Sequence, residues 1–165
     1  MTLPTTAAED WIDDIYNAVV SEALASGWFE RVNGHEPTNK PGHGLTCAVW
    51  IQAGPDPLAG QAGSGLSTSS ALLTFNVRVY TPMTAEPRDE IDPNVAKAVS
   101  NLMRRWHDNY DFGLHPLVRN VDLLGQSGTR LASRAGYVEQ SGSLCRVMTI
   151  TLPILVNDVW PQGSS

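Results

Sequence analysis

Residues 71–80 have the sequence Ala-Leu-Leu-Thr-Phe-Asn-Val-Arg-Val-Tyr, and their alternation decides the class of fold. The odd positions are apolar, whereas polar or aromatic side chains occupy the even positions from Thr74 onward. Successive side chains of a strand point to opposite faces of a sheet, so this run predicts a strand with one buried face. We expect Pro82 to end it, because proline cannot donate a hydrogen bond to a neighbouring strand.

Other alternating runs predict four further strands. One spans residues 45–53, where the odd positions are again apolar. Three more lie in the last third of the chain, at 118–124, 129–139 and 144–156, and Gly/Ser turns separate them. We expect these three to form a β-meander, with Pro153 at an edge or a bulge of the sheet.

Two segments with apolar residues at steps of three and four predict amphipathic helices. Thr6 and Glu9 have the spacing of a capping box, so we expect the first helix to begin there. Asp92 is expected to cap the second helix, which should end before Gly113. Trp106 belongs to the apolar stripe of the second helix and is expected to lie in the core.

The order of these elements predicts an α+β fold, with a mixed or mainly antiparallel β-sheet and two amphipathic helices packed on one face. A chain of 165 residues suits one core, so residues 1–165 are expected to form a single domain. Residues 54–70 are rich in Gly and Ser and are expected to form a long flexible loop. Residues 157–165 are expected to leave the sheet as a tail.

Composition argues against two classes of protein. A net charge of −6 does not suit a protein that coats nucleic acid, because binding to phosphate needs concentrated Lys and Arg. The charge is uneven: residues 1–92 hold twelve acids and four bases, whereas the remainder holds five acids and seven bases. Such polarity suits head-to-tail stacking, and an ordinary solvated surface explains it as well.

The first eight residues lack a secretory signal pattern, and no apolar run approaches the ~20 residues that span a bilayer, so we expect cytoplasmic synthesis and no membrane contact.

No sequence pattern points to catalysis or to a metal. The segment from Gly63 to Ala71 looks like the phosphate loop of small-metabolite kinases, but an alternating strand follows where that loop needs a helix. The histidines lack the spacing of a metal pair, and there is no Gly-x-Ser-x-Gly elbow. Cys47 and Cys145 lie in alternating runs and are expected to be buried free thiols. We therefore predict no catalytic, cofactor-binding or metal-binding residues, and no cofactor.

The whole pattern of elements resembles a family of viral proteins. It comprises an N-terminal helix, an alternating strand that ends in Thr81-Pro82, a capped helix, and a final run Arg146-Val-Met-Thr-Ile-Thr-Leu-Pro-Ile-Leu-Val-Asn-Asp-Val-Trp160. This order is similar to that of the tail terminator proteins of siphoviruses, especially those of phages that infect actinobacteria. The resemblance spans residues 8–160 and rests on no single motif.

The resemblance implies a structural protein of the virion, without catalytic residues. Copies of the chain would form a homohexameric ring that caps the tail tube, stops tube polymerisation and joins the tail to the head. The implied partners are other copies of the chain, the tail tube protein and the head-tail connector protein, and viral DNA would pass through the central hole without sequence-specific binding. The implied location is the tail-head junction of the virion, and the host cytoplasm during assembly.

Subunit and partner contacts are expected at the loop before residue 71 and at the tail after Val156, because flexible segments can order on binding. Arg130 and Arg134 lie four apart on the predicted strand 129–139, share a face, and can line a pore or meet an acidic neighbour. The full set of candidate contact residues is Gly63, Gly65, Leu66, Arg130, Arg134, Asp158 and Trp160.

Other classes of protein stay open on the sequence. Another phage neck or head-completion protein would have a similar small α+β fold, and a capsid decoration protein would share the fold without the ring. An enzyme acting on a small substrate would need a convergent polar pocket, which no motif indicates. Turnover of a substrate would favour the enzyme, whereas the oligomeric state with and without a tube partner separates a decoration protein from a terminator.

Overall fold

The computed structural model describes residues 9–34, 45–57, 68–85, 87–113, 115–140 and 142–161. Its elements follow the chain in the order α1 (Asp10–Ala25), β1 (Arg31–Asn33), β2 (Thr46–Pro57), β3 (Thr68–Pro82), the short 3₁₀ helix η2 (Arg88–Glu90), α2 (Ile91–Asp108), β4 (Val118–Val121), β5 (Ala132–Gln140) and β6 (Ser143–Pro161).

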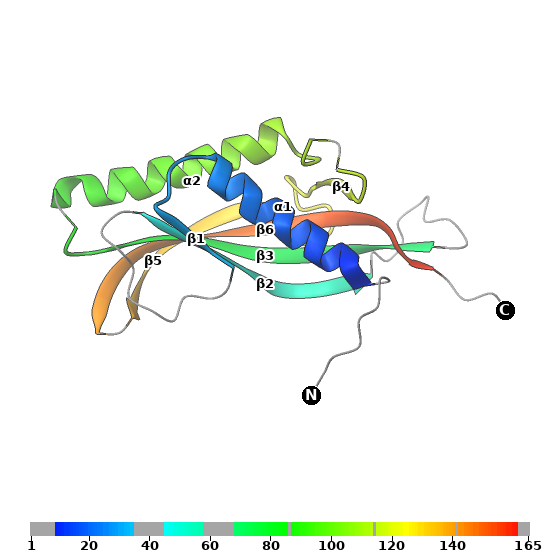
Figure 1. The fold of residues 1–165 in the computed structure, drawn as a ribbon, viewed down its shortest axis with the longest axis horizontal. Helices are drawn as coiled ribbons and strands as arrows, with labels where there is room; N and C mark the ends of the chain where they lie inside the picture. The colour runs from blue at the N-terminus through cyan, green and yellow to red at the C-terminus, as the bar shows by residue number, and fades with distance from the viewer. Residues whose placement is uncertain are drawn as a thin grey trace.

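The described strands form one mixed sheet in the order β1-β2-β3-β6. β1 is parallel to β2, and every other pair is antiparallel. β3 pairs with β6 along nearly its whole length, and the other edge of β6 is shared: β5 pairs with its first half and β4 with its second half. The predicted α+β class is therefore confirmed, with β3 and β6 as the central strands (Figure 1).

Both helices pack on the same face of this sheet, as predicted (Figure 1). The alternation of β3 and β6 turns their apolar side chains toward the helices, and each helix turns its apolar stripe toward the sheet. An ion pair between Arg105 Nε and Glu22 Oε1, at 2.9 Å, also joins α2 to α1. Burying each large apolar side chain contributes about 1.5–3 kcal/mol. The fully buried residues of this core include Ile15, Val19, Leu73, Phe75, Val77, Leu102, Trp106, Ile150, Leu152 and Ile154.

A smaller apolar cluster lies on the opposite face of the sheet and contains Ala48, Tyr80, Cys145 and Val147. The hydroxyl of Tyr80 accepts a hydrogen bond from Asn33 Nδ2 at 3.3 Å, which links the cluster to β1. Both cysteines are buried free thiols, as expected. Cys47 lies on the face of the sheet that the helices cover. Burial raises the pKa of its thiol to about 12, so its reactive thiolate is absent at neutral pH.

The central strands are longer than the sequence pattern predicted. β6 continues to Pro161, where it pairs with Thr68 at the start of β3. The prediction that residues 157–165 leave the sheet is therefore wrong for 157–161, because the early start of β3 gives them a partner strand. Residues 54–57 and 68–70 of the predicted loop likewise belong to strands, and its remainder, 58–67, lies outside the described residues.

The second helix does not begin with the cap that the sequence predicted, whereas Thr6 of the predicted first cap lies outside the described residues. Glu9 occupies the N-cap position of α1 and makes no side-chain cap bond. α2 begins at Ile91, directly after η2, so Asp92 falls inside its first turn. The carboxylate of Asp92 instead accepts a hydrogen bond from Arg146 Nε at 2.9 Å. Its negative charge, in the first turn of α2, also interacts favourably with the positive end of the helix dipole.

Gly54 lies at an irregular point of β2 and has a φ of +91°. A Cβ atom there would lie 2.6 Å from the carbonyl oxygen of Leu72 on β3, so we expect Gly54→Ala to lower the free energy of unfolding by about 2–3 kcal/mol. Gly128→Ala is the matched control, because Gly128 has a φ of +105° and no atom within 4 Å of its added Cβ. It should cost only about 1 kcal/mol in urea unfolding. Equal losses would contradict a steric role for Gly54.

Candidate functional site

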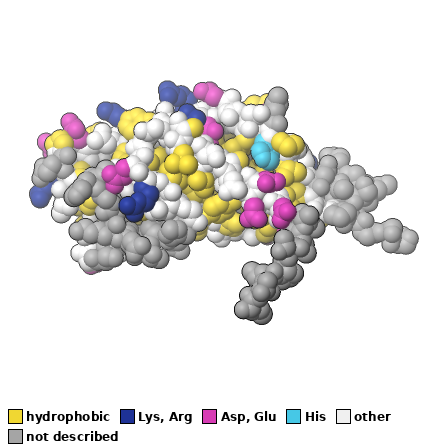
Figure 2. Space-filling view, viewed as in Figure 1, with side chains coloured by type: hydrophobic (Ala, Val, Ile, Leu, Met, Phe, Trp, Pro, Cys, Tyr) yellow, Lys and Arg dark blue, Asp and Glu magenta, His cyan; other side chains and the backbone are white. Residues whose placement is uncertain are grey.

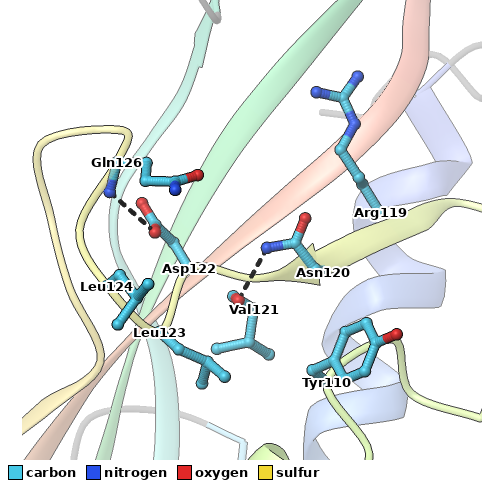
Figure 3. A pocket seen from close by; sticks show the side chains of 8 residues that line it. All are labelled: Tyr110, Arg119, Asn120, Val121, Asp122, Leu123, Leu124 and Gln126. Carbon is cyan, nitrogen blue, oxygen red and sulfur yellow. Dashed lines mark hydrogen bonds between the residues drawn. The ribbon is translucent and has the colours of Figure 1, made fainter.

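A hollow of about 340 Å³ lies beside β4, between the end of α2 and the segment that follows β4 (Figure 3). Both β4 and the segment that follows it supply polar and apolar side chains to the hollow, and Tyr110 comes from the turn after α2. Figure 3 shows Asn120 near its centre, Arg119 and Gln126 to either side, and Tyr110 at the lower end. The lining residues are Tyr110, Arg119, Asn120, Val121, Asp122, Leu123, Leu124 and Gln126.

Asp122 organises the loop on one side of this hollow. Its buried carboxylate accepts hydrogen bonds from the backbone N–H groups of Gly125, Gln126 and Ser127 at 2.8–3.0 Å, and from the hydroxyl of Ser127. Burial raises the pKa of Asp122, but these hydrogen bonds outweigh burial, and the pKa is lowered overall. The carboxylate is thus ionised and fully occupied by its own loop, which suits a structural role better than acid–base chemistry.

Arg119 lies on the other side of the hollow and is held by neutral groups. Its Nε donates to Asn157 Oδ1 at 2.7 Å, and its second terminal nitrogen, Nη2, donates to Ser70 Oγ at 2.9 Å. These acceptors come from β6 and β3, so the guanidinium is fixed by the sheet itself. Both ion pairs found within the described residues belong to other arginines, Arg105 and Arg146.

The turn that follows α2 forms one end of the hollow. Tyr110 follows α2, and its carbonyl oxygen accepts a hydrogen bond from the N–H of Val121 at 2.7 Å, which fixes this turn against β4. Tyr110 and Leu124 are exposed, the latter by 82 %, although both carry large side chains. Exposed side chains of this size beside a hollow mark a surface that a ligand or partner can cover.

A second, smaller hollow of about 220 Å³ lies on the outer face of α2. Its lining contains two bases, Lys97 and Arg104, together with Trp28, Ser100 and Asn101. The side-chain oxygen of Asn101 is buried without a hydrogen-bond partner within the described part of the chain. The amide of Asn101 can be rotated to place its nitrogen there, so this oxygen alone assigns no ligand.

The structure does not gather the predicted contact residues into one site. Arg134 is exposed on β5, but β5 begins only at Ala132, so Arg130 precedes the strand and the prediction that both share its face is wrong. Arg130 instead packs near Gly125 in the Asp122 loop, because the N–H of Leu131 donates to the carbonyl of Asp122 and holds the chain out of the sheet.

The other predicted contact residues lie elsewhere. Trp160 is partly buried in β6, and its ring meets that of Trp11 edge to face at 6.3 Å between centroids, so it belongs to the fold as well as to the surface. Asp158 is also part of β6, but its side chain is not among those described. Gly63, Gly65 and Leu66 lie outside the described residues.

No sequence signal marked the exposed end of the β5–β6 hairpin. Tyr137 on β5 and Leu144 on β6 are 57 % and 51 % exposed, and both lie on the face that the helices cover farther along the sheet. The guanidinium of Arg146 lies 4.5 Å from the ring centroid of Tyr137 and holds it in place. The sequence placed Leu144 on the apolar face of the predicted strand 144–156, in which nothing marks where the helix layer stops.

The described histidines have local partners. The side chain of His107 contacts the carbonyl of Met103 at 2.8 Å, and His115 Nδ1 accepts a hydrogen bond from the N–H of Leu117 at 3.2 Å. Within the described ranges, no three His, Cys, Asp or Glu side chains gather as a metal site requires. Among the helices that the structure describes, none is long and apolar enough to cross a membrane.

No protein-family model matches the chain, and no curated protein sequence matches it.

Proposed function

We propose that this chain is a structural protein of a phage virion that caps the end of the tail tube as a homohexameric ring. The ring stops tube polymerisation and joins the tail to the head-tail connector protein at the tail-head junction, after assembly in the host cytoplasm. Viral DNA passes through its centre without sequence-specific binding. The protein acts by steric contact and not as an enzyme.

The observation that carries this proposal is the open edge of β5. β5 pairs with β6 in unbroken register from Ala132 to Gln140, and no other described strand pairs with its outer edge. The exposed side chains of Tyr137 and Leu144 lie at the same end of the sheet. A regular edge with exposed apolar side chains is a surface to which another chain can add a strand or pack.

The opposite edge of the sheet has a different character. β1 covers only residues 46–48 of β2, and the rest of β2 contains two register shifts, Pro55 and Pro57. Such features prevent another strand from pairing at this edge. A ring closed by rotation joins two unlike sides of each subunit, and the two edges of this sheet are unlike.

The charge distribution also supports a head-to-tail assembly. Figure 2 shows a group of acidic side chains over the start of α1, whereas basic side chains lie over α2 together with some acidic ones. Glu9, Asp10, Asp13 and Asp14 at the start of α1 are all exposed, as are Lys97 and Arg104 on α2. Unlike charges on separate surfaces favour ordered contacts between copies.

The direct test is the mass of the protein by light scattering or native mass spectrometry, alone and after mixing with the tail tube protein of the same virus. The proposal expects a hexamer in solution or a hexamer that forms only on the tube end. A monomer that does not bind the tube would contradict it and would favour a decoration protein or an enzyme.

Leu144→Asp is expected to weaken ring formation or binding to the tube end at least about tenfold, because it places a charge in the proposed apolar contact. The free energy of unfolding should change by less than about 0.5 kcal/mol, since the side chain is already half exposed. Leu24→Asp is the matched control, because Leu24 on α1 is 58 % exposed and lies away from the hairpin. Assembly that survives Leu144→Asp unchanged would remove this hairpin from the interface.

A further inference from the structure

We propose that the hollow on the outer face of α2 receives the acidic start of α1 from the next copy of the chain in the ring. This basic hollow, named after its two bases, is lined by Trp28, Lys97, Ser100, Asn101 and Arg104. The acidic start of α1 comprises Glu9, Asp10, Asp13 and Asp14. The inference rests on the proposed ring and names a contact between its neighbouring copies.

The first argument is that charge of one sign gathers on each helix. α1 and its N-cap residue contain acids and no base. The acids of α2 lie only at its two ends, Asp92 and Asp108, and the residues between them include Lys97, Arg104 and Arg105 but no acid. Unlike charges on separate surfaces of one chain give its copies a favourable head-to-tail contact.

The second argument is that these charges are not neutralised within one copy. The ion pairs found among the described residues join Arg105 to Glu22 and Arg146 to Asp92. Neither base of the basic hollow, and none of the four acids at the start of α1, forms an ion pair within the described ranges. All six side chains are exposed, so both groups can meet the charges of a second molecule.

The third argument is that the two surfaces lie toward opposite ends of the subunit. Arg146, near the start of β6, binds Asp92 in the first turn of α2. Trp160, near the end of β6, contacts Trp11, which lies among the acids of α1. Fourteen residues separate these two positions of β6, or about 45 Å along the strand. Figure 1 likewise shows the start of α1 and the β5–β6 hairpin at opposite ends of the long axis. A ring closed by rotation brings such opposite sides of neighbouring copies together.

The spacing of the two sets of charges fits this contact. The two bases of the hollow are seven residues apart, which is two helical turns and about 10 Å along α2. Asp10 and Asp14 are one turn apart, about 6 Å, so both carboxylates can lie between the two bases. Ser100 and Asn101 lie between the same bases and can donate neutral hydrogen bonds to these carboxylates.

Nucleic acid is the other polyanion that two bases can attract. Its phosphates bind surfaces on which many bases gather, whereas the basic hollow has two and the whole chain carries a net charge of −6. Trp28 forms part of the wall, and tryptophan is enriched in contacts between proteins. The basic hollow therefore favours a second copy of the chain over nucleic acid.

Charge reversal in the full chain tests the contact. Lys97→Glu with Arg104→Glu reverses the basic hollow. Asp10→Lys with Asp13→Lys and Asp14→Lys reverses the start of α1. Each variant alone sets like charges against each other, so we expect it to assemble at least about tenfold more weakly, in solution or on the tube end. Native mass spectrometry and light scattering measure the assembly, and circular dichroism checks that each variant is folded.

An equimolar mixture of the two variants gives the sharper test. In alternating order, the unmodified hollow of one variant receives the unmodified acids of the other, and the two reversed surfaces meet with their signs exchanged. Assembly of the mixture should therefore return to within about threefold of that of the unmodified chain. Its rings should contain equal numbers of the two variants, because only alternating neighbours are compatible.

Arg130→Glu is the matched control for Arg104→Glu, because Arg130 is an exposed arginine that belongs to neither surface. Arg104→Glu alone should weaken assembly at least about threefold, and Arg130→Glu should leave it unchanged. Leu24→Asp remains a control for this contact as well, because Leu24 belongs to neither surface.

Three results would overturn this contact and leave the proposed ring standing. They are a ring that withstands reversal of either surface, a mixture of folded variants that does not assemble, and assembly that is lost only when the hollow is reversed. In the third case, DNA binding that the same reversal abolishes would assign the hollow to nucleic acid. An unmodified chain that neither forms a ring nor binds the tube end would instead contradict the proposed function, and this contact with it.

Discussion

Trp106→Ala is expected to lower the free energy of unfolding by about 3–5 kcal/mol. Trp106 is completely buried in α2 and is the largest fully buried side chain among the described residues. It packs in the cluster that joins both helices to the sheet, so alanine leaves a cavity that rigid neighbours on β3 and β6 cannot fill. Urea unfolding followed by circular dichroism measures the loss, with the slope against urea unchanged if the folded state stays compact.

Trp106→Phe separates the volume of this side chain from its polar atom. The indole N–H of Trp106 is buried and makes no hydrogen bond within the described chain, so its removal forfeits no bond. Phenylalanine should therefore cost only about 1–2 kcal/mol, from the smaller ring. Lys97→Ala, at an exposed position of the same helix, should change stability by less than about 0.5 kcal/mol. A loss for Trp106→Ala no larger than that for Trp106→Phe would contradict the packing of α2 described above.

The core could be predicted from the sequence because it depends on local periodicity. The apolar steps that include Leu102 and Trp106 placed one face of α2 in the core, and the alternation of residues 71–80 placed the apolar face of β3. The ends of strands depend on pairing instead, which is not local. β6 reaches Pro161 because β3 starts at Thr68 and offers its backbone there, and no property of residues 157–161 alone announces it.

The hollow beside β4 was not predicted, because distant segments build it. Arg119 looks like an ordinary surface arginine in the sequence, and its significance comes from Asn157 and Ser70, which lie 38 and 49 residues away. The Asp122 loop is different, since it carries a local signal. An aspartate followed by Gly125 and Ser127 is typical of a turn in which the carboxylate accepts backbone N–H groups, and this signal would have ended the predicted strand 118–124 earlier.

Asp122→Asn is expected to lower the free energy of unfolding by about 3 kcal/mol at neutral pH. The native carboxylate accepts hydrogen bonds at both oxygens, from three backbone N–H groups and from Ser127 Oγ. Asparagine retains one acceptor oxygen, and its amide N–H₂ group would face the N–H of Ser127 as donor against donor. Ser127→Ala is the milder control: it removes only the hydroxyl and should cost about 1 kcal/mol.

The effect of pH distinguishes the charge of Asp122 from the shape of its side chain. The pKa of Asp122 in the folded chain lies below its ordinary value of 3.8, so the stability that its ionised form contributes is fully present well above pH 3.8. That contribution is lost as the pH falls through the folded pKa, because the carboxyl then takes up a proton in the folded and the unfolded chain alike. Asp122→Asn has no such proton to gain. The difference in unfolding free energy between the two proteins should therefore be constant from pH 7 to about pH 5 and should shrink below pH 3.8. A difference that stays constant down to the lowest pH at which both proteins fold would mean that the loop recognises the shape of Asp122 and not its charge.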